Sequence, residues 1–334
     1  MSARSKGILV GGAVLVILLV MLHVLSRYDL LGLHGSGLPD SFRYNQKDER
    51  VIDPKLLQYH QMADIPTGLS NPRDLHEAPD GKVYVVGDQA VRLLNADGSI
   101  AEQFATGGEA RCIDLASDGT IFLGVGDHVE VYSPAGQKLG SWEPVGDDEV
   151  VTGIAVDGNE VFYGAYPIRK FFRCDRNGTV LNPVAVRDPA DDYPGLKAPS
   201  PYLSVAVDDR GLVWINNPGH LRIEAHTRQG EFQHAWGKSL ENTDAKDIAA
   251  FPGCCNPIDF DILPDGRFVT AEKGKNLQTV KVFQKEGFLE AIVVPSGKFA
   301  PTTPPMAVAA DAEGGILVLD PWRKSVRVFE LKQK

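Results

Sequence analysis

RDLHEAPDGKVYVVGDQAVRLLNADGSIAEQF, residues 73–104, returns in altered form five more times before the chain ends. Each copy contains segments rich in Val, Ile, Phe and Tyr, joined by an Asp-Gly or similar turn, and most copies have a second glycine turn further on. Such residues suit pleated, half-buried strands, and Gly accepts the positive φ that tight hairpins need. One complete copy therefore predicts four antiparallel strands.

The other copies follow in tandem to the end of the chain. They begin with RCIDLASDGT at 111, VTGIAVDGNE at 151, LSVAVDDRGL at 203, IDFDILPDGR at 258 and MAVAADAEGG at 306. A four-stranded unit repeated six times predicts an all-β, six-bladed β-propeller. Because the last copy stops after its third strand, we expect residues 55–65, KLLQYHQMADI, to supply the missing outer strand of the last blade and close the ring.

The N-terminal segment predicts a membrane anchor. Residues 7–26, GILVGGAVLVILLVMLHVLS, form a run of 20 without Asp, Glu, Lys or Arg, enough for a helix that spans a hydrocarbon core of roughly 30 Å. Arg4 and Lys6 precede the run, so the positive-inside rule places residues 1–6 in the cytoplasm. A cleaved signal peptide is the alternative, but no small-x-small site follows the apolar run.

The remaining chain divides into two parts. Residues 27–55 contain Gly, Pro and mixed charge with little periodicity, as expected of a tether. Residues 56–334 form the predicted propeller, which lies on the periplasmic or extracellular side. The formal net charge of -10 and the lack of a basic stripe argue against nucleic-acid binding, and 4 cysteines are too few for a disulfide scaffold.

The repeats resemble the NHL-repeat family over roughly residues 56–334. The resemblance rests on the Asp-Gly hairpin, on β-rich runs such as YVVGD at 84–88 and LVLD at 317–320, and on strands like RVF at 327–329. It implies a six-bladed propeller whose loops before the first strand and between the second and third strands share one face. The family includes binding platforms, sensors and a few enzymes, so the resemblance implies the fold more than the function.

Two adjacent cysteines, Cys254 and Cys255, stand before the fifth copy in the stretch FPGCCNP. NPIDFDILPDG at 256–266 matches NPRDLHEAPDG at 71–81 at six of eleven positions, so the Asn-Pro step belongs to the repeat and the cysteines do not. The stretch is similar to one in bacterial envelope NHL proteins. Two interpretations stay open: a redox or soft-metal pair, with copper as the possible metal, or two small residues packed at a crowded bend.

The predicted loop-rich face carries the other candidate site residues. The long inter-blade segments 185–201 and 237–256 are expected to emerge there as well. We assign six further residues to this binding face: Asn256, Glu272, Lys273, Lys275, Arg73 and Tyr202. Cys112 and Cys174 are expected in the core, and the 8 histidines lack metal-binding spacing.

Three functions remain open from the sequence. The first is a non-catalytic platform that binds a protein partner or a small ligand, with the membrane contacted through residues 7–26. The second is a redox or metal-handling accessory of an envelope electron-transfer system that uses Cys254 and Cys255. The third is a propeller enzyme, a lyase or a dehydrogenase, although the chain lacks the repeated Trp signature of quinoprotein propellers and the metal-binding histidines of NHL lyases.

Overall fold

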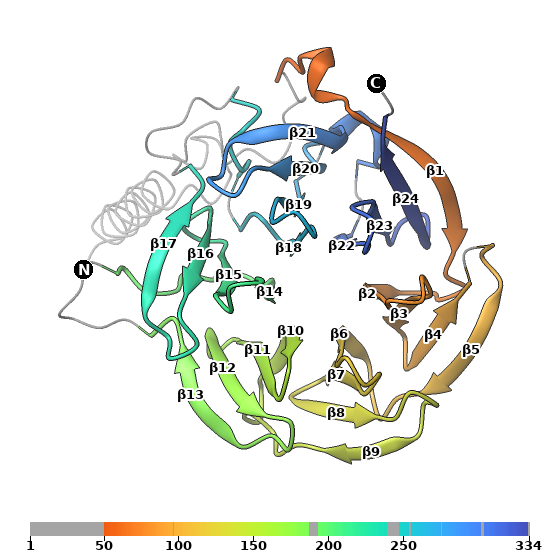
Figure 1. Ribbon diagram of the computed structural model, residues 1–334, viewed down its shortest axis with the longest axis vertical. Coiled ribbons are helices and arrows are strands. Elements are labelled where there is room, and N and C mark those ends of the chain that lie inside the picture. The colour runs from red at the N-terminus through yellow and green to blue at the C-terminus, as the bar shows by residue number, and fades with distance from the viewer. Residues whose placement is uncertain are drawn as a thin grey trace, which may run out of the picture. The chain divides into compact units, whose positions relative to one another are not determined.

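The computed structural model describes residues 50–95, 97–186, 193–238, 247–253, 255–274, 276–301 and 304–332. These residues build six four-stranded antiparallel sheets, arranged as blades around an axis (Figure 1). The predicted all-β, six-bladed propeller is therefore confirmed. The predicted stub, anchor and nearly all of the tether lie outside the described residues. Within the described part, no helix is long and apolar enough to cross a membrane.

Five blades each take four consecutive strands, which run from the axis outward. The first contains β2 (Pro72–Glu77), β3 (Val83–Gly87), β4 (Ala90–Leu94) and β5 (Ile100–Ala105). The second contains β6 (Ala110–Leu115), β7 (Ile121–Val125), β8 (His128–Tyr132) and β9 (Lys138–Ser141). The third contains β10 (Val150–Asp157), β11 (Glu160–Tyr166), β12 (Lys170–Asp175) and β13 (Val180–Val184). The fourth contains β14 (Val205–Val207), β15 (Val213–Asn217), β16 (Arg222–His226) and β17 (Phe232–Trp236). The fifth contains β18 (Asp259–Ile262), β19 (Phe268–Glu272), β20 (Thr279–Phe283) and β21 (Leu289–Val294).

The sixth blade joins the two ends of the propeller. It contains β22 (Ala307–Ala310), β23 (Ile316–Asp320), β24 (Ser325–Leu331) and, as its outer strand, β1 (Tyr59–Pro66). β1 pairs antiparallel with β24, from Tyr59 opposite Leu331 to Pro66 opposite Ser325 (Figure 1). The strand begins later than the expected residue 55, because Pro54–Leu56 forms a 3-10 turn, η2, before it.

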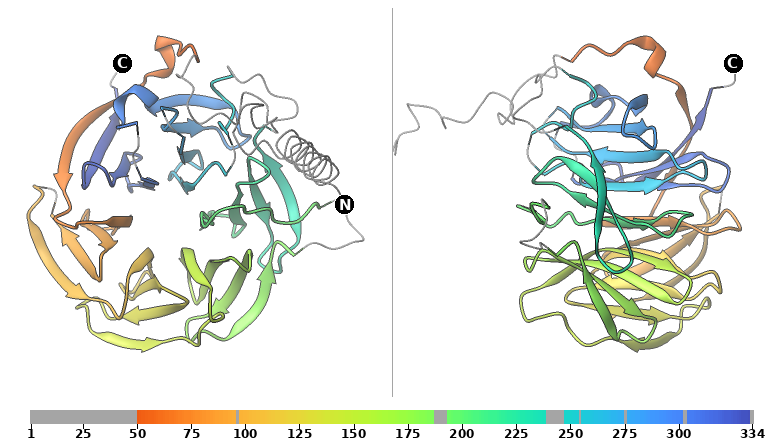
Figure 2. Two further views of the ribbon diagram at one scale, coloured as in Figure 1. Left: turned by 180° about the vertical axis from the view of Figure 1, so that it is seen from behind. Right: turned by 60° about the vertical axis from the view of Figure 1, so that its left-hand side comes forward.

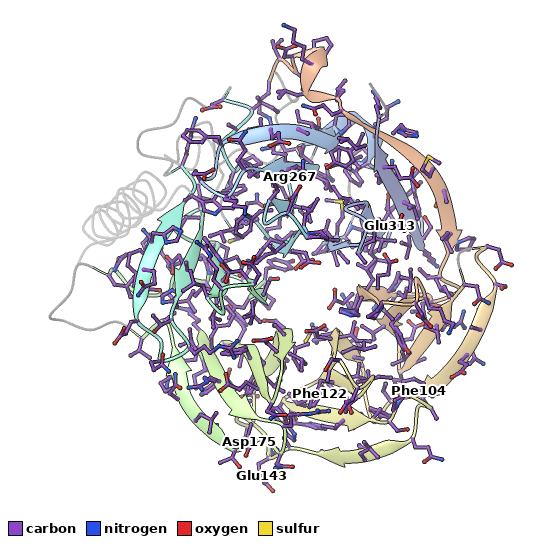
Figure 3. The ribbon with its side chains drawn as sticks, viewed as in Figure 1. Phe104, Phe122, Glu143, Asp175, Arg267 and Glu313 are labelled. Atoms are coloured by element: carbon purple, nitrogen blue, oxygen red, sulfur yellow. The ribbon has the colours of Figure 1, made fainter. Side chains whose placement is uncertain are left out.

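The core lies between neighbouring blades rather than within one. The second strand of five blades is buried at every position, for example Val83–Gly87. Aromatic rings fill the spaces between blades: Phe104 of β5, labelled in Figure 3, lies 5.1 Å from Tyr132 of β8, and Trp142, directly after β9, lies 6.1 Å from Tyr163 of β11. Blade-to-blade packing therefore fixes the ring and the positions of its innermost strands.

Candidate functional site

A cavity of about 470 Å³ lies on the axis of the propeller. Residues of the innermost strands, or of the loops that lead into them, line it from all six blades. Seen from behind, the innermost strands surround the axis (Figure 2). The volume falls in the range of small-molecule sites.

Along the wall of this cavity, aspartates of the innermost strands link one blade to the next. Each uses Oδ2 to accept a hydrogen bond from a backbone N–H of the next blade. The distances are 3.0 Å from Asp74 to Ile113, 2.6 Å from Asp114 to Val156, 2.8 Å from Asp259 to Val308 and 2.8 Å from Asp261 to Ala310. Innermost strands of different blades belong to separate sheets, so these carboxylates satisfy donors that no strand pairing reaches. We call these contacts the inter-blade clasps.

Burial raises the pKa values of three aspartates that form the inter-blade clasps. It raises the pKa of Asp259 to about 7, against a hydrogen bond from the Ser204 hydroxyl 2.7 Å away. It also raises the pKa of Asp261 to about 6. For Asp74, burial and then the charge of Asp259 raise the pKa well above its usual range. Burial therefore favours the protonated form of these carboxylates.

His76 adds a basic group to the same wall. Its Nδ1 lies 2.9 Å from Oδ1 of Asp114. Burial alone would lower the pKa of His76, but the charge of Asp114 and its hydrogen bond outweigh burial and raise the pKa. The imidazole is thus held in place by a carboxylate that also clasps the third blade.

Two guanidinium groups and one carboxylate meet at one end of the cavity, which we call the mouth. Glu109 Oε1 accepts hydrogen bonds from Arg73 Nε at 2.8 Å and from Arg73 Nη2 at 2.6 Å. Glu109 Oε2 lies 3.6 Å from Arg111 Nη2, and the amide of Asn71 donates to Oε1 at 3.3 Å. Arg73 and Arg111 also line the cavity.

The fifth blade contributes to the mouth through Lys273. Its Nζ lies 4.4 Å from the centroid of the Tyr202 ring, which lines the cavity. Asn256, nearly fully buried, holds the Lys273 peptide: Nδ2 donates to the carbonyl at 2.9 Å, and Oδ1 accepts from the N–H at 2.8 Å. The loop before β18 and the loop after β19 therefore meet on one face.

Burial raises the pKa of Tyr202, nearby Cys255 adds to the shift, and Arg73 opposes it. Arg73, Tyr202, Lys273, Asn256 and Cys255 thus lie near one another at the mouth. Cys255 itself is buried, at 3% exposure, with a φ of 65°.

Glu272 is not part of this face. It is the last residue of β19, is fully buried, and pairs with the fully buried Lys281 of β20 at 2.8 Å. Its assignment to the binding face is wrong, because β19 includes Glu272 and buries its side chain. Cys254 and Lys275 lie outside the described residues. Cys112 and Cys174 are buried, as expected.

Sequence reasoning missed Arg111, Glu109 and the clasps. A signal was present: the residue eight places before the first turn glycine is Arg in the first two copies, Arg73 and Arg111, and apolar in the other four. No three His, Cys, Asp or Glu side chains of the described residues converge to hold a metal ion.

No family model matches the sequence, and no curated protein matches it either. Solved structures do. A structural genomics protein of unknown function from Bacteroides thetaiotaomicron is 14% identical, with a TM-score of 0.61 over 82% of this chain and 76% of that one. Virginiamycin B lyase from Staphylococcus aureus is 12% identical, with a TM-score of 0.55 over 82% and 99%. The WD40 propeller domain of Doa1 is 16% identical, with a TM-score of 0.52 over 82% and 97%. At such identities these likenesses show the fold alone: the chain is a six-bladed β-propeller.

Proposed function

We propose that the chain is a ligand-binding propeller of the NHL-repeat type, held outside the membrane by its N-terminal segment, which takes a small polar ligand into the axial cavity. The observation that carries this proposal is the cavity of about 470 Å³ with charged side chains of different blades converging at its mouth. Concave sites of this size with a few convergent polar groups are typical of small-molecule binding.

The polar groups of the cavity favour binding over catalysis. The Ser204 hydroxyl donates to Asp259, while His76 pairs with Asp114, so the two pairs do not combine into a nucleophile and its base. The clasp carboxylates are already engaged with backbone donors. Binding requires only that a ligand match the shape and charge of the mouth.

A redox or metal-handling role of Cys254 and Cys255 is the second candidate. It is favoured by one observation: Cys255 lies close enough to Tyr202, a residue of the cavity wall, to affect its pKa. A vicinal pair there would place its chemistry at the mouth, with copper as a possible soft metal. The two functions are separated by the cysteine variants described in the Discussion.

Filling the cavity tests the proposed function. Ala206 occupies the place in its repeat that His76 and Asp261 occupy in theirs, and it lines the cavity, so Ala206→Phe fills it. Ala101→Phe, on the exposed strand β5, is the matched control. Each full chain is dialysed to equilibrium against a polar metabolite extract, and retained molecules are identified by mass spectrometry. We expect retention by the wild type and Ala101→Phe only; retention of the same molecules by Ala206→Phe would contradict the proposal.

A further inference from the structure

We propose that the ligand carries a carboxylate, which Arg73 and Arg111 bind together at the mouth of the axial cavity, with Glu109 as the positioning residue. This inference rests on the proposed function and names the chemistry of its ligand. Four observations carry it. The two guanidinium groups lie close together, and Glu109 contacts them without lining the cavity. Other blades have uncharged residues at the position of these arginines, and positive side chains surround the mouth.

The two guanidinium groups are held at a spacing that a carboxylate can bridge. Oxygens of the one Glu109 carboxylate lie 2.6 Å from Arg73 Nη2 and 3.6 Å from Arg111 Nη2. An arginine has five N–H donors in a planar fork suited to carboxylates. Glu109 uses Nε and Nη2 of Arg73 and leaves other donors of both forks for a second anion.

Glu109 approaches the arginines from outside the cavity. Arg73 and Arg111 line the cavity, whereas Glu109 does not. Its carboxylate therefore fixes the two forks from behind, and Asn71 fixes the carboxylate in turn. We therefore expect a ligand in the cavity to use the guanidinium N–H groups that Glu109 does not engage.

The arginines depart from what the repeat requires. At the same position of the innermost strand the third to sixth blades have Thr152, Leu203, Ile258 and Met306, none of them charged. Blade geometry thus accepts an apolar residue there, and Ile258 and Met306 are in fact buried in the blade core. Two adjacent blades instead place charged side chains at the cavity, which packing does not demand.

The charge of the mouth selects an anion. Arg73, Arg111 and Lys273 lie around it, with Glu109 as the carboxylate that pairs with the arginines. Deeper in the cavity the wall is acidic, with Asp74, Asp114, Asp259 and Asp261 engaged in the inter-blade clasps, so the mouth is the part of the cavity where a carboxylate meets positive charge. A carboxylate bound at the mouth exchanges part of its hydration for the fixed guanidinium donors.

Calorimetric titration of the full chain tests the inference with three probes: glutarate, its neutral isostere glutaramide, and inorganic phosphate. We expect the wild type to bind glutarate and not glutaramide. Arg73→Gln and Arg111→Gln should each weaken glutarate binding about tenfold or more, the loss expected for one charge-assisted hydrogen bond. Arg210→Gln, in an exposed turn, is the matched control and should leave binding unchanged.

Glu109 is tested through a pair of variants. Glu109→Ala should weaken glutarate binding, and Glu109→Gln, which keeps an acceptor for Arg73, should restore part of it. A general loss of structure would not be rescued in this way, and thermal melts of each variant show whether it folds.

Several results would overturn the inference. One is a wild type that does not bind glutarate, and another is arginine variants that bind glutarate as tightly as the wild type does. A third is phosphate binding as strong as glutarate binding and equally weakened by the arginine substitutions. If these occur while Ala206→Phe still abolishes metabolite retention, the cavity binds a ligand of other chemistry and only the inference fails. If Ala206→Phe changes nothing, the proposed function itself fails.

Discussion

Lys281 Nζ lies 2.8 Å from Glu272 Oε1, and both side chains are fully buried in the fifth blade. Lys281 also donates to the backbone carbonyl of Ala250 at 3.1 Å, so the pair connects β19 and β20 to the segment before β18. A buried charge is tolerated only with its partner, because the desolvation penalty of either ion alone is large. Each charge of this pair therefore depends on the other, within the blade that carries Lys273 and Asn256.

Removing one member of the pair should be costly. We expect Lys281→Met to lower the free energy of unfolding by about 3–5 kcal/mol, because the buried Glu272 carboxylate loses its ion-pair partner. Replacing both, with Glu272→Leu and Lys281→Met, should recover most of the loss. Lys82→Met, which breaks the exposed pair with Asp80, is the control and should leave stability nearly unchanged. Denaturant unfolding measures all three, and a double variant no more stable than Lys281→Met would refute the account.

The clasps predict that stability rises as pH falls from about 8 to about 5. The folded pKa values of Asp259, about 7, and Asp261, about 6, lie above the unfolded value near 4, so the folded state binds more protons in this window. The stability of the protonated form is therefore lost as pH rises through the folded pKa values. His76 and Glu77, whose pKa values are also raised, act in the same direction.

Asparagine substitution tests this directly. Asp259→Asn and Asp261→Asn keep an oxygen that accepts the clasp hydrogen bond but remove the titration. We expect the melting temperature of the wild type to fall by at least about 3 °C between pH 5.5 and pH 8, and the double variant to show a flatter profile. Equal slopes for the two proteins would show that other groups control the pH dependence.

Closure of the ring predicts the effect of a truncation. β1 covers the edge of β24 and buries Tyr59 and Ile65, and burial of each such side chain contributes about 1.5–3 kcal/mol. A chain that begins at residue 67 should melt well below one that begins at residue 50, and its exposed strand edge should cause association. Calorimetry and size-exclusion chromatography measure both effects. A truncated chain that remains monomeric with an unchanged melting temperature would show that closure is dispensable.

Cysteine chemistry separates the two proposed functions. Burial raises the pKa of Cys174 to about 12 and that of Cys112 well above its usual range, so neither should react with iodoacetamide at pH 8 until the protein unfolds. Any alkylation of the native chain then reports on Cys254 and Cys255. The binding proposal expects Cys254→Ser with Cys255→Ser to leave glutarate binding intact. Lost binding with preserved folding would favour the cysteine-based function.

The fold could be predicted from the sequence because each of the six repeats encodes a similar four-stranded blade through its own strands and turns. Turn glycines such as Gly81, with a φ of 78°, mark hairpins that any single copy reveals. The incomplete last copy pointed to a strand from the other end of the propeller, and β1 fills that position. The predicted start of that strand, residue 55, was wrong: Pro54–Leu56 forms a turn, and the strand begins at Tyr59.

The site was predicted only in part. Arg73, Tyr202 and Lys273 were placed on one face by the order of loops in the repeat, and the structure brings them together. Arg111 and Glu109 escaped notice because their roles depend on contacts between blades, which arise only when the ring forms. Glu272 was misplaced because its polar flank resembled a loop, whereas a buried lysine accommodates it.

Titration of glutarate into the Ala206→Phe chain tests the central claim most directly, since it joins the ligand chemistry of the mouth to the space of the axial cavity. The account predicts that the wild type and Ala101→Phe bind glutarate with equal affinity and that Ala206→Phe, folded to the same melting temperature within error, does not bind it. Undiminished binding by Ala206→Phe would contradict the account, because the carboxylate would then be held somewhere other than the axial cavity.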